Sequence, residues 1–264
     1  MIVTLLTDFG TADYFVGAMK GVILSENPEA RVVDVTHEIP PQDVRAGAFT
    51  LLAVYGSFPL GTIHVAVIDP GVGSNRRPIL VSVGGQFFIG PDNGLFSYIY
   101  ERERDERVFH LTVKEYFRPL VSATFHGRDV FAPVAAALSK GVRPEQLGEL
   151  ITDYVRLPSL GPKVLPGKGI EASILHIDRF GNCVTNLTPE HLSEEMIARG
   201  ARLLVNGREI TSFRRFFAEG ADSPGQLFAI WGSAGFLEIA AYQDSAARLL
   251  DAETGQTIKV TNDE

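Results

Sequence analysis

The chain contains 264 residues, of which 45% are hydrophobic and 21% are charged. This balance is typical of a globular protein with enough apolar side chains for a sizeable core, and the length predicts one large domain or two smaller ones. The formal net charge of −8 argues against a nucleic-acid partner, because such a partner requires a basic face.

The sequence also bears on where the protein works. No apolar stretch approaches the roughly 20 residues that span a bilayer, and the first residues lack the basic region of a signal peptide. The single cysteine, Cys183, cannot form an internal disulfide. We therefore expect a cytoplasmic protein without a membrane partner, in which Cys183 is a buried small residue and not a nucleophile.

The first half of the chain alternates strand and helix patterns. Short apolar runs rich in Val and Ile predict strands at 2–6, 31–36, 63–68, 79–83, 86–89 and 108–113. Helical spacing of apolar residues predicts helices between Asp13 and Pro28, at 47–55, at 95–100 and from 129 onward. This alternation predicts an α/β fold, in which an N-terminal domain is built on a mainly parallel central sheet.

The second half has a different character. Residues 157–169 hold three prolines and three glycines, which is typical of a linker. Beyond them, strand patterns occur at 172–177, 183–187, 201–205 and 236–240, and Asn206-Gly207 is a strong hairpin turn. We predict an N-terminal catalytic domain at 1–160, a linker at 161–169, and a smaller, mostly antiparallel β domain at 170–264.

The loop between two predicted strands carries the first candidate site. The apolar run at 63–68 stops at Asp69, a Pro-Gly turn follows, and Arg76 returns just before the next run. In open α/β sheets, ligands bind at the carboxyl ends of strands. A carboxylate and a guanidinium there could orient and polarise a small polar reactant. On their own they could equally form a surface salt bridge across the loop.

His126 could complete this candidate site. It lies between Phe125 and Gly127 at a predicted helix N-terminus, where the helix dipole disfavours the imidazolium. With Asp69 and Arg76 it could surround a water molecule, and the alternative is a structural histidine. No ligand spacing supports a metal bound by histidines and aspartates, so we expect no metal.

Two further groups of residues could bind a nucleoside. Asp8 and Asp13 follow the first strand and could accept hydrogen bonds from a ribose diol, although Asp13 could be only a helix cap. In the second half, Asp178, Phe180 and Asn182 share a tight turn. An aromatic ring and an amide suit adenine, by stacking and by hydrogen bonds to its edge. The same residues also suit an ordinary turn.

Taken together, these motifs resemble one family, in order and along nearly the whole chain. They are TDFGT at 7–11, DVTH at 34–37, IPP at 39–41, DPGVG at 69–73, PDNG at 91–94, TFHGRD at 124–129 and DRFGN at 178–182. The chain is similar to the S-adenosyl-L-methionine hydroxide adenosyltransferases, which are related to the fluorinase and chlorinase. The resemblance implies a hydrolase that converts S-adenosyl-L-methionine to adenosine and methionine. Water or hydroxide would attack the ribose 5′ carbon, with S-adenosyl-L-methionine as substrate and no cofactor.

The resemblance also implies roles for individual residues. The implied catalytic residues are Asp69, Arg76 and His126, and the sequence leaves open whether Arg76 or the neighbouring Arg77 faces the site. The implied substrate-binding residues are Asp8, Asp13, Thr124, Phe125, Asp178, Phe180, Asn182, Phe217, Ser233, Glu238 and Ala241. Ser233 and Glu238 are expected near the methionine end, where this chain departs from the family by having Gly232 in place of an asparagine.

The chemistry of this reaction agrees with such a site. The sulfonium of the substrate leaves as a neutral thioether, so the leaving group needs no general acid. Water, with a pKa of about 15.7, must instead be activated as the nucleophile, and Asp69 and His126 could accept or orient its protons.

Two alternatives belong to other classes. A halogenase would use chloride or fluoride on the same substrate, but Asp69 would repel a halide by ~4 kcal/mol at ~4 Å with an effective dielectric of ~20. The halogenases of the family lack that acid. A non-catalytic module that binds S-adenosyl-L-methionine or adenosine is the other alternative.

The family's assembly, carried over by resemblance, is a homotrimer with sites at subunit interfaces. The expected nucleoside residues divide between the two predicted domains. The linker is short, so residues from two neighbouring subunits could complete each site. Such a heterologous contact closes into a ring.

Overall fold

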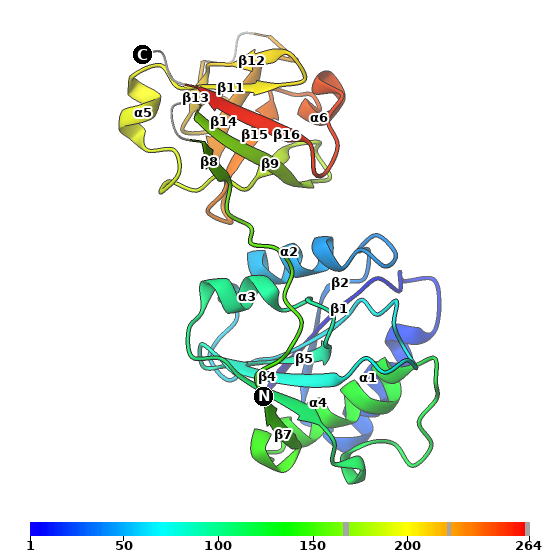
Figure 1. Cartoon of the computed structure of the whole chain (residues 1–264). Coiled ribbons are helices and arrows are strands. Elements are labelled where there is room, and N and C mark those ends of the chain that lie inside the picture. The colour runs from blue at the N-terminus through cyan, green and yellow to red at the C-terminus, as the bar shows by residue number, and fades with distance from the viewer. Residues whose placement is uncertain (166–168, 221–222, 262–264) are drawn as a thin grey trace. The chain divides into compact units, whose positions relative to one another are not determined.

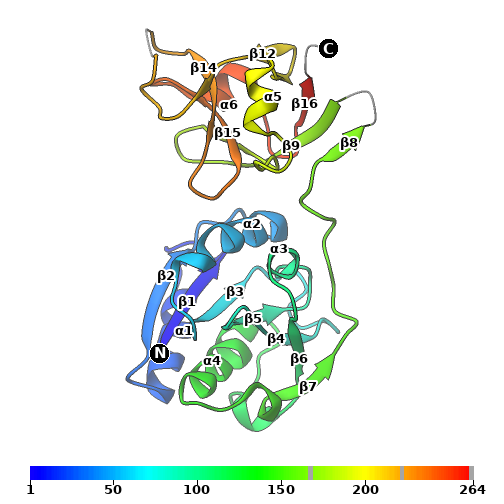
Figure 2. The same cartoon turned by 90° about the vertical axis from the view of Figure 1, so that its left-hand side faces the viewer.

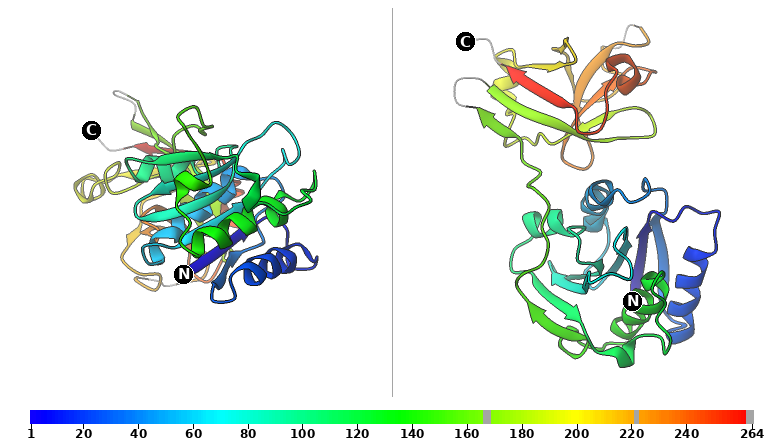
Figure 3. Two further views of the ribbon diagram at one scale, coloured as in Figure 1. Left: turned by 90° about the horizontal axis from the view of Figure 1, so that it is seen from below. Right: turned by 45° about the vertical axis from the view of Figure 1, so that its right-hand side comes forward.

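The computed structural model describes residues 1–165, 169–220 and 223–261. The chain divides into two compact units, Met1–Ser159 and Leu160–Glu264. The first unit runs from blue to green in Figure 1, and the second from green to red. Figure 3 gives two further views of the same elements. Each unit is described by itself.

The first unit is built on a seven-stranded sheet. In spatial order its strands are β2 (Arg31–Thr36), β1 (Ile2–Thr7), β3 (Ile63–Val67), β5 (Gln86–Pro91), β4 (Pro78–Val83), β6 (Arg107–Leu111) and β7 (Gly148–Ile151). The pairs from β2 to β5 are parallel, whereas β4 is antiparallel to β5 and β6, and β7 is antiparallel to β6. All strands except β4 and β7 therefore run in one direction, which confirms the prediction of a mainly parallel sheet.

Helices cover both faces of this sheet, as Figure 2 shows. Helices α1 (Phe15–Glu26) and α4 (Ala132–Ser139) lie on one face, and α2 (Val44–Val54) and α3 (Ser97–Arg102) lie on the other. Because both faces are covered, β1 and β3 are buried along almost their whole length. Short 3-10 turns occupy Tyr55–Ser57, Lys114–Tyr116 and Pro144–Gln146. None of the described helices is long and apolar enough to cross a membrane.

The residues that cap α2 and α1 differ from those expected from the sequence. Helix α2 begins at Val44, three residues early, because the Asp43 side chain accepts a hydrogen bond from Ala46 N over 2.9 Å. For α1 the capping residue is Tyr14, which makes no side-chain capping bond. The prediction that Asp13 caps this helix is therefore wrong, and Asp13 is exposed.

The helix predicted from 129 onward begins earlier and in an unusual form. A π-helical turn, Gly127–Phe131, precedes α4, and Ala132 N donates to Gly127 O five residues back. Pro133 follows and has no N–H to donate, so the backbone pattern changes at this point. His126 occupies the N-terminal cap position of the turn.

The second unit is a β domain whose strands form one curled sheet. Its path runs β12 (Arg208–Ile210), β11 (Arg202–Val205), β16 (Thr257–Thr261), β9 (Gly169–Ile177), β10 (Cys183–Thr185), β15 (Leu237–Ala241), β14 (Leu227–Trp231) and β13 (Phe213–Arg214), with β8 (Lys163–Leu165) beside β9. Among the described strands of this unit, only β13 and β14 form a parallel pair. The mostly antiparallel prediction is confirmed, and the Asn206-Gly207 turn joins β11 to β12 with φ of 47° and 76°.

Several elements of the second unit were not predicted. Helices α5 (Glu194–Ala198) and α6 (Ala246–Leu250) are too short to show a helical period, although each follows a serine whose side chain caps it. Strand β8 and the first residue of β9 fall inside the segment predicted as a linker, which is therefore not simply a linker. Residues 166–168 of that segment lie outside the described residues.

Candidate functional site

Three side chains selected from the sequence meet at the carboxyl end of β3. Arg76 Nε donates to Asp69 Oδ1 over 3.0 Å, and Arg76 Nη2 donates to Asp69 Oδ2. The same Nη2 lies 3.0 Å from His126 Nδ1. The Arg76 and Asp69 side chains are only 7% and 5% exposed. The pair is therefore a buried bidentate contact and not a surface salt bridge.

A close approach between two loops brings His126 to this pair. Gly73 has a φ of +77°, and a Cβ at this position would lie 2.2 Å from Ala123 O. Only glycine allows both the left-handed backbone and the contact. Because Ala123 is three residues before His126, this contact fixes the loop that carries the histidine against the loop that carries Asp69.

Hydrogen-bond chemistry sets the state of the histidine. A guanidinium can only donate, so the lone pair of His126 Nδ1 faces Arg76. Burial lowers the pKa of His126, and the positive charge of Arg76 lowers it further. The ring is therefore neutral, with its proton on Nε2. A neutral ring was expected from the position at the helix terminus, and the structure adds burial and the guanidinium as causes.

The carboxyl group of Asp69 is also perturbed. Burial raises its pKa, against the charge and the hydrogen bonds of Arg76, which lower it. A carboxylate with a raised pKa holds a proton more readily and is a better proton acceptor. The backbone of Gly71 also donates to this carboxylate, so of its roughly four acceptor sites one remains beside those used by Arg76 and Gly71.

Arg76 has one donor to spare. Its Nη1 is buried and has no hydrogen-bond partner among the described residues. The guanidinium also lies over the Phe131 ring, with Cζ 5.5 Å from the ring centroid. A buried donor that lacks a partner is costly unless a bound group accepts from it. The oxygen of a water or hydroxide would be such a group.

The structure distinguishes the two neighbouring arginines. Arg77 Nε donates to Asp92 Oδ2 over 2.9 Å, and its Nη1 donates to Asp153 Oδ1 over 2.8 Å. Arg77 is thus engaged by other carboxylates, and only Arg76 faces Asp69.

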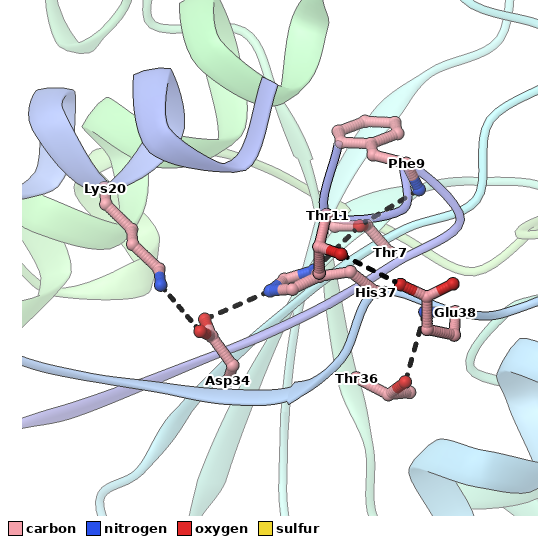
Figure 4. A network of polar contacts seen from close by, with 8 residues as sticks. All are labelled: Thr7, Phe9, Thr11, Lys20, Asp34, Thr36, His37 and Glu38. Carbon is pink, nitrogen blue, oxygen red and sulfur yellow. Dashed lines mark hydrogen bonds and ion pairs between the residues drawn. The ribbon is translucent and has the colours of Figure 1, made fainter. Parts of the chain in front are cut away.

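The turn after β1 carries Asp8 and is tied to His37, as Figure 4 shows for the surrounding network. Thr7 Oγ1 lies 2.9 Å from His37 Nδ1, and Gly10 N donates to His37 O over 2.7 Å. Asp8 Oδ2 accepts from Gln42 N over 2.8 Å. Its other carboxylate oxygen has no hydrogen-bond partner within the described part of the chain and can accept from a ligand.

The other expected residues of the first unit differ in the contacts that they make. Phe125 is buried against Phe15, with ring centroids 5.2 Å apart. Thr124 Oγ1 shares a hydrogen bond with Ser122 Oγ over 3.1 Å. Asp13 is exposed and makes no hydrogen bond or ion pair with any described residue, so nothing in the first unit ties it to Asp8.

In the second unit the predicted turn is held by Asp178. Its Oδ1 accepts from Phe180 N and Asn182 N, both over 2.8 Å, and its Oδ2 accepts from Asn182 Nδ2 over 2.9 Å. Asp178 therefore supports the turn and orients the amide of Asn182. The Phe180 ring is left 78% exposed.

A cavity of about 470 Å³ opens beside this turn. Four of its lining residues were among those expected to bind substrate, namely Phe180, Asn182, Phe217 and Ala241. Gln243 and Asp244 complete the lining and were not expected. Small-molecule sites commonly have volumes of about 300–1,000 Å³ and combine apolar walls with a few polar groups. The second unit therefore offers a site that suits an aromatic, hydrogen-bonding ligand.

Ser233 and Glu238 do not line this cavity. Burial raises the pKa of Glu238, and the negative charge of Asp178 raises it further. A Cβ at Gly232 would lie 1.9 Å from Glu238 Oε1. The glycine that departs from the family pattern thus gives the Glu238 side chain its place, and an asparagine would require that side chain to move.

Three other features of the structure add little to the candidate site. Cys183 is buried and its pKa is raised by burial to about 11, in agreement with the predicted inert thiol. No group of three or more His, Cys, Asp or Glu residues that could hold a metal ion occurs among residues 1–165, 169–220 and 223–261. A larger cavity of about 720 Å³, between α1 and α4, contains none of the expected site residues.

Comparison with known proteins gives consistent matches. The family model for the SAM hydroxide adenosyltransferase N-terminal domain matches residues 3–148, and that for the C-terminal domain matches residues 172–259. An (R)-S-adenosyl-L-methionine hydrolase from Methanocaldococcus jannaschii is 36% identical, with 98% of this chain and 95% of that protein covered. A fluorinase from Nocardia brasiliensis is 24% identical, with 98% of this chain and 96% of that protein covered. A solved structure of an uncharacterized conserved protein from Thermotoga maritima has a TM-score of 0.92 and 33% identity, over 99% of this chain and all of that one.

Proposed function

This chain belongs to the SAM hydroxide adenosyltransferase family, and from that premise we propose that it hydrolyses S-adenosyl-L-methionine to adenosine and L-methionine. The observation that carries the proposal is the buried contact of Asp69 with Arg76 and of Arg76 with His126. The hydrolase relative is 36% identical and the fluorinase 24% identical, which favours hydrolysis over halogenation.

In this proposal a water molecule donates to the Asp69 carboxylate, which accepts its proton. The guanidinium of Arg76 lies against the same carboxylate, and its positive charge favours the hydroxide character that develops on the water oxygen. The neutral His126 accepts a hydrogen bond from Arg76 at Nδ1, and its Nε2–H remains available as a donor. A bond forms from oxygen to the ribose 5′ carbon as the bond from that carbon to sulfur breaks. The bonding pair moves to sulfur, and the sulfonium becomes a neutral thioether.

A dry site assists this step. Attack of hydroxide on a sulfonium brings opposite charges together and removes both, so low polarity favours the transition state over the separated charges. The halide alternative would place an anion beside the Asp69 carboxylate with no proton to neutralise either group. The same burial that assists hydrolysis therefore disfavours halogenation.

The remaining expected residues bind the rest of the substrate. Asp8 accepts from the ribose diol with its free carboxylate oxygen, and the exposed Asp13 on the same loop offers the ribose a second carboxylate. Phe180 and Phe217 pack on the adenine, Asn182 bonds its edge, and the residues around Ala241 close the cavity. Thr124 and Phe125 form the wall next to His126, and Ser233 with Glu238 binds the methionine end. We also propose a cytoplasmic location, since the only cysteine is a buried free thiol.

The direct test is incubation with S-adenosyl-L-methionine, with and without chloride or fluoride, followed by chromatography of the products. The expected products are adenosine and methionine in every case. The hydrolase relative is named for the (R) epimer at sulfur, so both epimers are to be supplied. A halogenated nucleoside as the main product would favour the halogenase alternative. Binding of adenosine without turnover of either epimer would favour a non-catalytic module.

Hydrolysis should not need a metal ion or other cofactor, because Asp69, Arg76 and His126 supply the proton acceptor and the positive charge. The expected result is an unchanged rate after dialysis against a chelator, measured by adenosine release. If activity is lost in chelator and returns with a divalent cation, the proposed roles of these residues are wrong.

The finer proposal is a homotrimer in which residues of two neighbouring subunits act on one substrate. It is supported by the division of the expected nucleoside residues, with Asp8 and Asp69 in the first unit and Asp178 and Asn182 in the second. Two inactive variants are prepared, Asp69→Asn and a variant changed at Asp178 and Asn182, and they are mixed after dissociation.

Some reassembled trimers should then pair two intact halves, and activity should return. Each variant dissociated and reassembled alone is the control. A fully active monomer by light scattering, or verified mixed oligomers without activity, would exclude shared sites.

A further inference from the structure

His37 holds the turn that carries Asp8 from both sides. Its ring Nδ1 bonds to Thr7 Oγ1 over 2.9 Å, and its carbonyl accepts from Gly10 N over 2.7 Å. Between these bonds, Phe9 N donates to Thr7 Oγ1 over 3.3 Å. The Thr7 and His37 side chains are buried. Both ends of the turn 7–10 therefore bond to His37, and Figure 4 shows the bond from the Thr7 side chain.

A charged pair on the far side of the ring sets its hydrogen-bonding direction. His37 Nε2 lies 3.1 Å from Asp34 Oδ1, and Asp34 Oδ2 accepts from Lys20 Nζ over 2.6 Å. Burial raises the pKa of Asp34, but Lys20 and His37 together hold it below its ordinary value. A carboxylate near Nε2 favours the tautomer with its proton there. Nδ1 is then the acceptor for the Thr7 hydroxyl, which leaves the Thr7 oxygen to accept from Phe9 N.

This turn leads to both parts of the proposed site. Asp8 points one carboxylate oxygen at Gln42 N and leaves the other free. The Phe9 ring packs edge-on against the Phe125 ring, with centroids 6.0 Å apart, and Phe125 directly precedes His126. A shift of the turn would therefore move the proposed diol acceptor relative to the histidine beside Arg76.

We propose that His37 is a positioning residue that fixes the carboxylate of Asp8 for recognition of a vicinal diol, the ribose of the nucleoside substrate. The inference rests on the proposed function, because Asp8 has its diol role there. His37 itself contacts no substrate. Its effect is on the orientation of Asp8, so it should appear in binding of the diol and not in the chemical step.

The same sheet contains a matched control. Thr4 Oγ1 lies 2.8 Å from His64 Nδ1, and His64 Nε2 lies 2.8 Å from Gln86 Oε1. This threonine–histidine pair is also fully buried, but Thr4 lies within β1 and not at its end. Replacing His64 should cost stability as replacing His37 does, with no effect on a turn at the carboxyl edge.

The test compares binding of adenosine with binding of 2′,3′-dideoxyadenosine, by calorimetry on the full chain. The unmodified protein should prefer adenosine by about tenfold or more, as expected for hydrogen bonds to a charged group. His37→Leu should lose most of this preference, and it should raise KM for S-adenosyl-L-methionine about tenfold or more with kcat at saturation nearly unchanged. His37→Asn places an amide oxygen near the Nδ1 position and should recover much of the preference.

His64→Leu should keep the full preference for the diol. If His37→Leu does not fold, Thr7→Val removes the same hydrogen bond with little change in shape, and Thr4→Val is its control. Full diol preference in the His37 or Thr7 variant would overturn the inference, as would an equal loss in the His64 or Thr4 variant. Diol-selective binding without hydrolysis would instead leave the role of His37 intact and refute the proposed function.

Discussion

Asp69→Asn should lower turnover of S-adenosyl-L-methionine by about 10²–10⁴-fold, the usual contribution of a positioned proton acceptor. The amide keeps the shape of the side chain but cannot take a proton from water. Adenosine binding should be nearly unchanged, because Asp8 and the cavity beside Phe180 are untouched. Single-turnover hydrolysis and calorimetric titration with adenosine measure the two effects separately.

His64→Leu is the matched control for damage to the fold, since His64 is fully buried in the same sheet but makes no contact with the site. Near-normal turnover in Asp69→Asn would show that the Asp69–Arg76 contact is only a structural ion pair. Formation of 5′-chloro-5′-deoxyadenosine by this variant at high chloride would further support the repulsion argument, but its absence would not weaken the role of Asp69.

Arg76→Met should abolish measurable hydrolysis and also destabilise the fold. Among the described residues, Arg76 is the one side chain that donates to both Asp69 oxygens. Its replacement leaves a carboxylate that is 5% exposed without its cation. Breaking a buried pair in this way costs about 3–5 kcal/mol of unfolding free energy. Denaturant unfolding of the purified variant measures this loss.

The double variant Asp69→Asn/Arg76→Met separates the two roles of the arginine. With no charge left in the pocket, much of the lost stability should return. Activity should not return, because neither the proton acceptor nor the positive charge beside it is present. A double variant as unstable as Arg76→Met would show that the loss comes from packing on Phe131 and not from an unpaired carboxylate.

The sequence predicted the regular elements best where local pattern decides structure. The strand at 31–36 was found to the residue, because a short Val-rich run is flanked by polar residues. The start of α2 was missed because the cap, Asp43, lies before the apolar period begins. Strand β8 was assigned to a linker because its pairing with β9 is tertiary and leaves no trace in a proline- and glycine-rich segment.

The site was predictable in its residue types but not in its geometry. That Arg76 and not Arg77 faces Asp69 depends on the loop before β4, where Asp92 and Asp153, both distant in sequence, hold Arg77. Thr7 and His37 are 30 residues apart, so their hydrogen bond could not be read from either motif. Gln243 enters the cavity lining through a left-handed backbone with φ of 52°, which no local composition indicates.

Hydrolysis in water enriched in ¹⁸O tests the central claim most directly, because it follows the oxygen that forms the new bond. Water activated beside Asp69 and Arg76 attacks the ribose 5′ carbon, so mass spectrometry should find one ¹⁸O in the 5′-hydroxyl of adenosine and none in methionine. Label in the amino-acid product, cleavage to a nucleoside that still carries sulfur, or unlabelled adenosine would each contradict attack by water at that carbon.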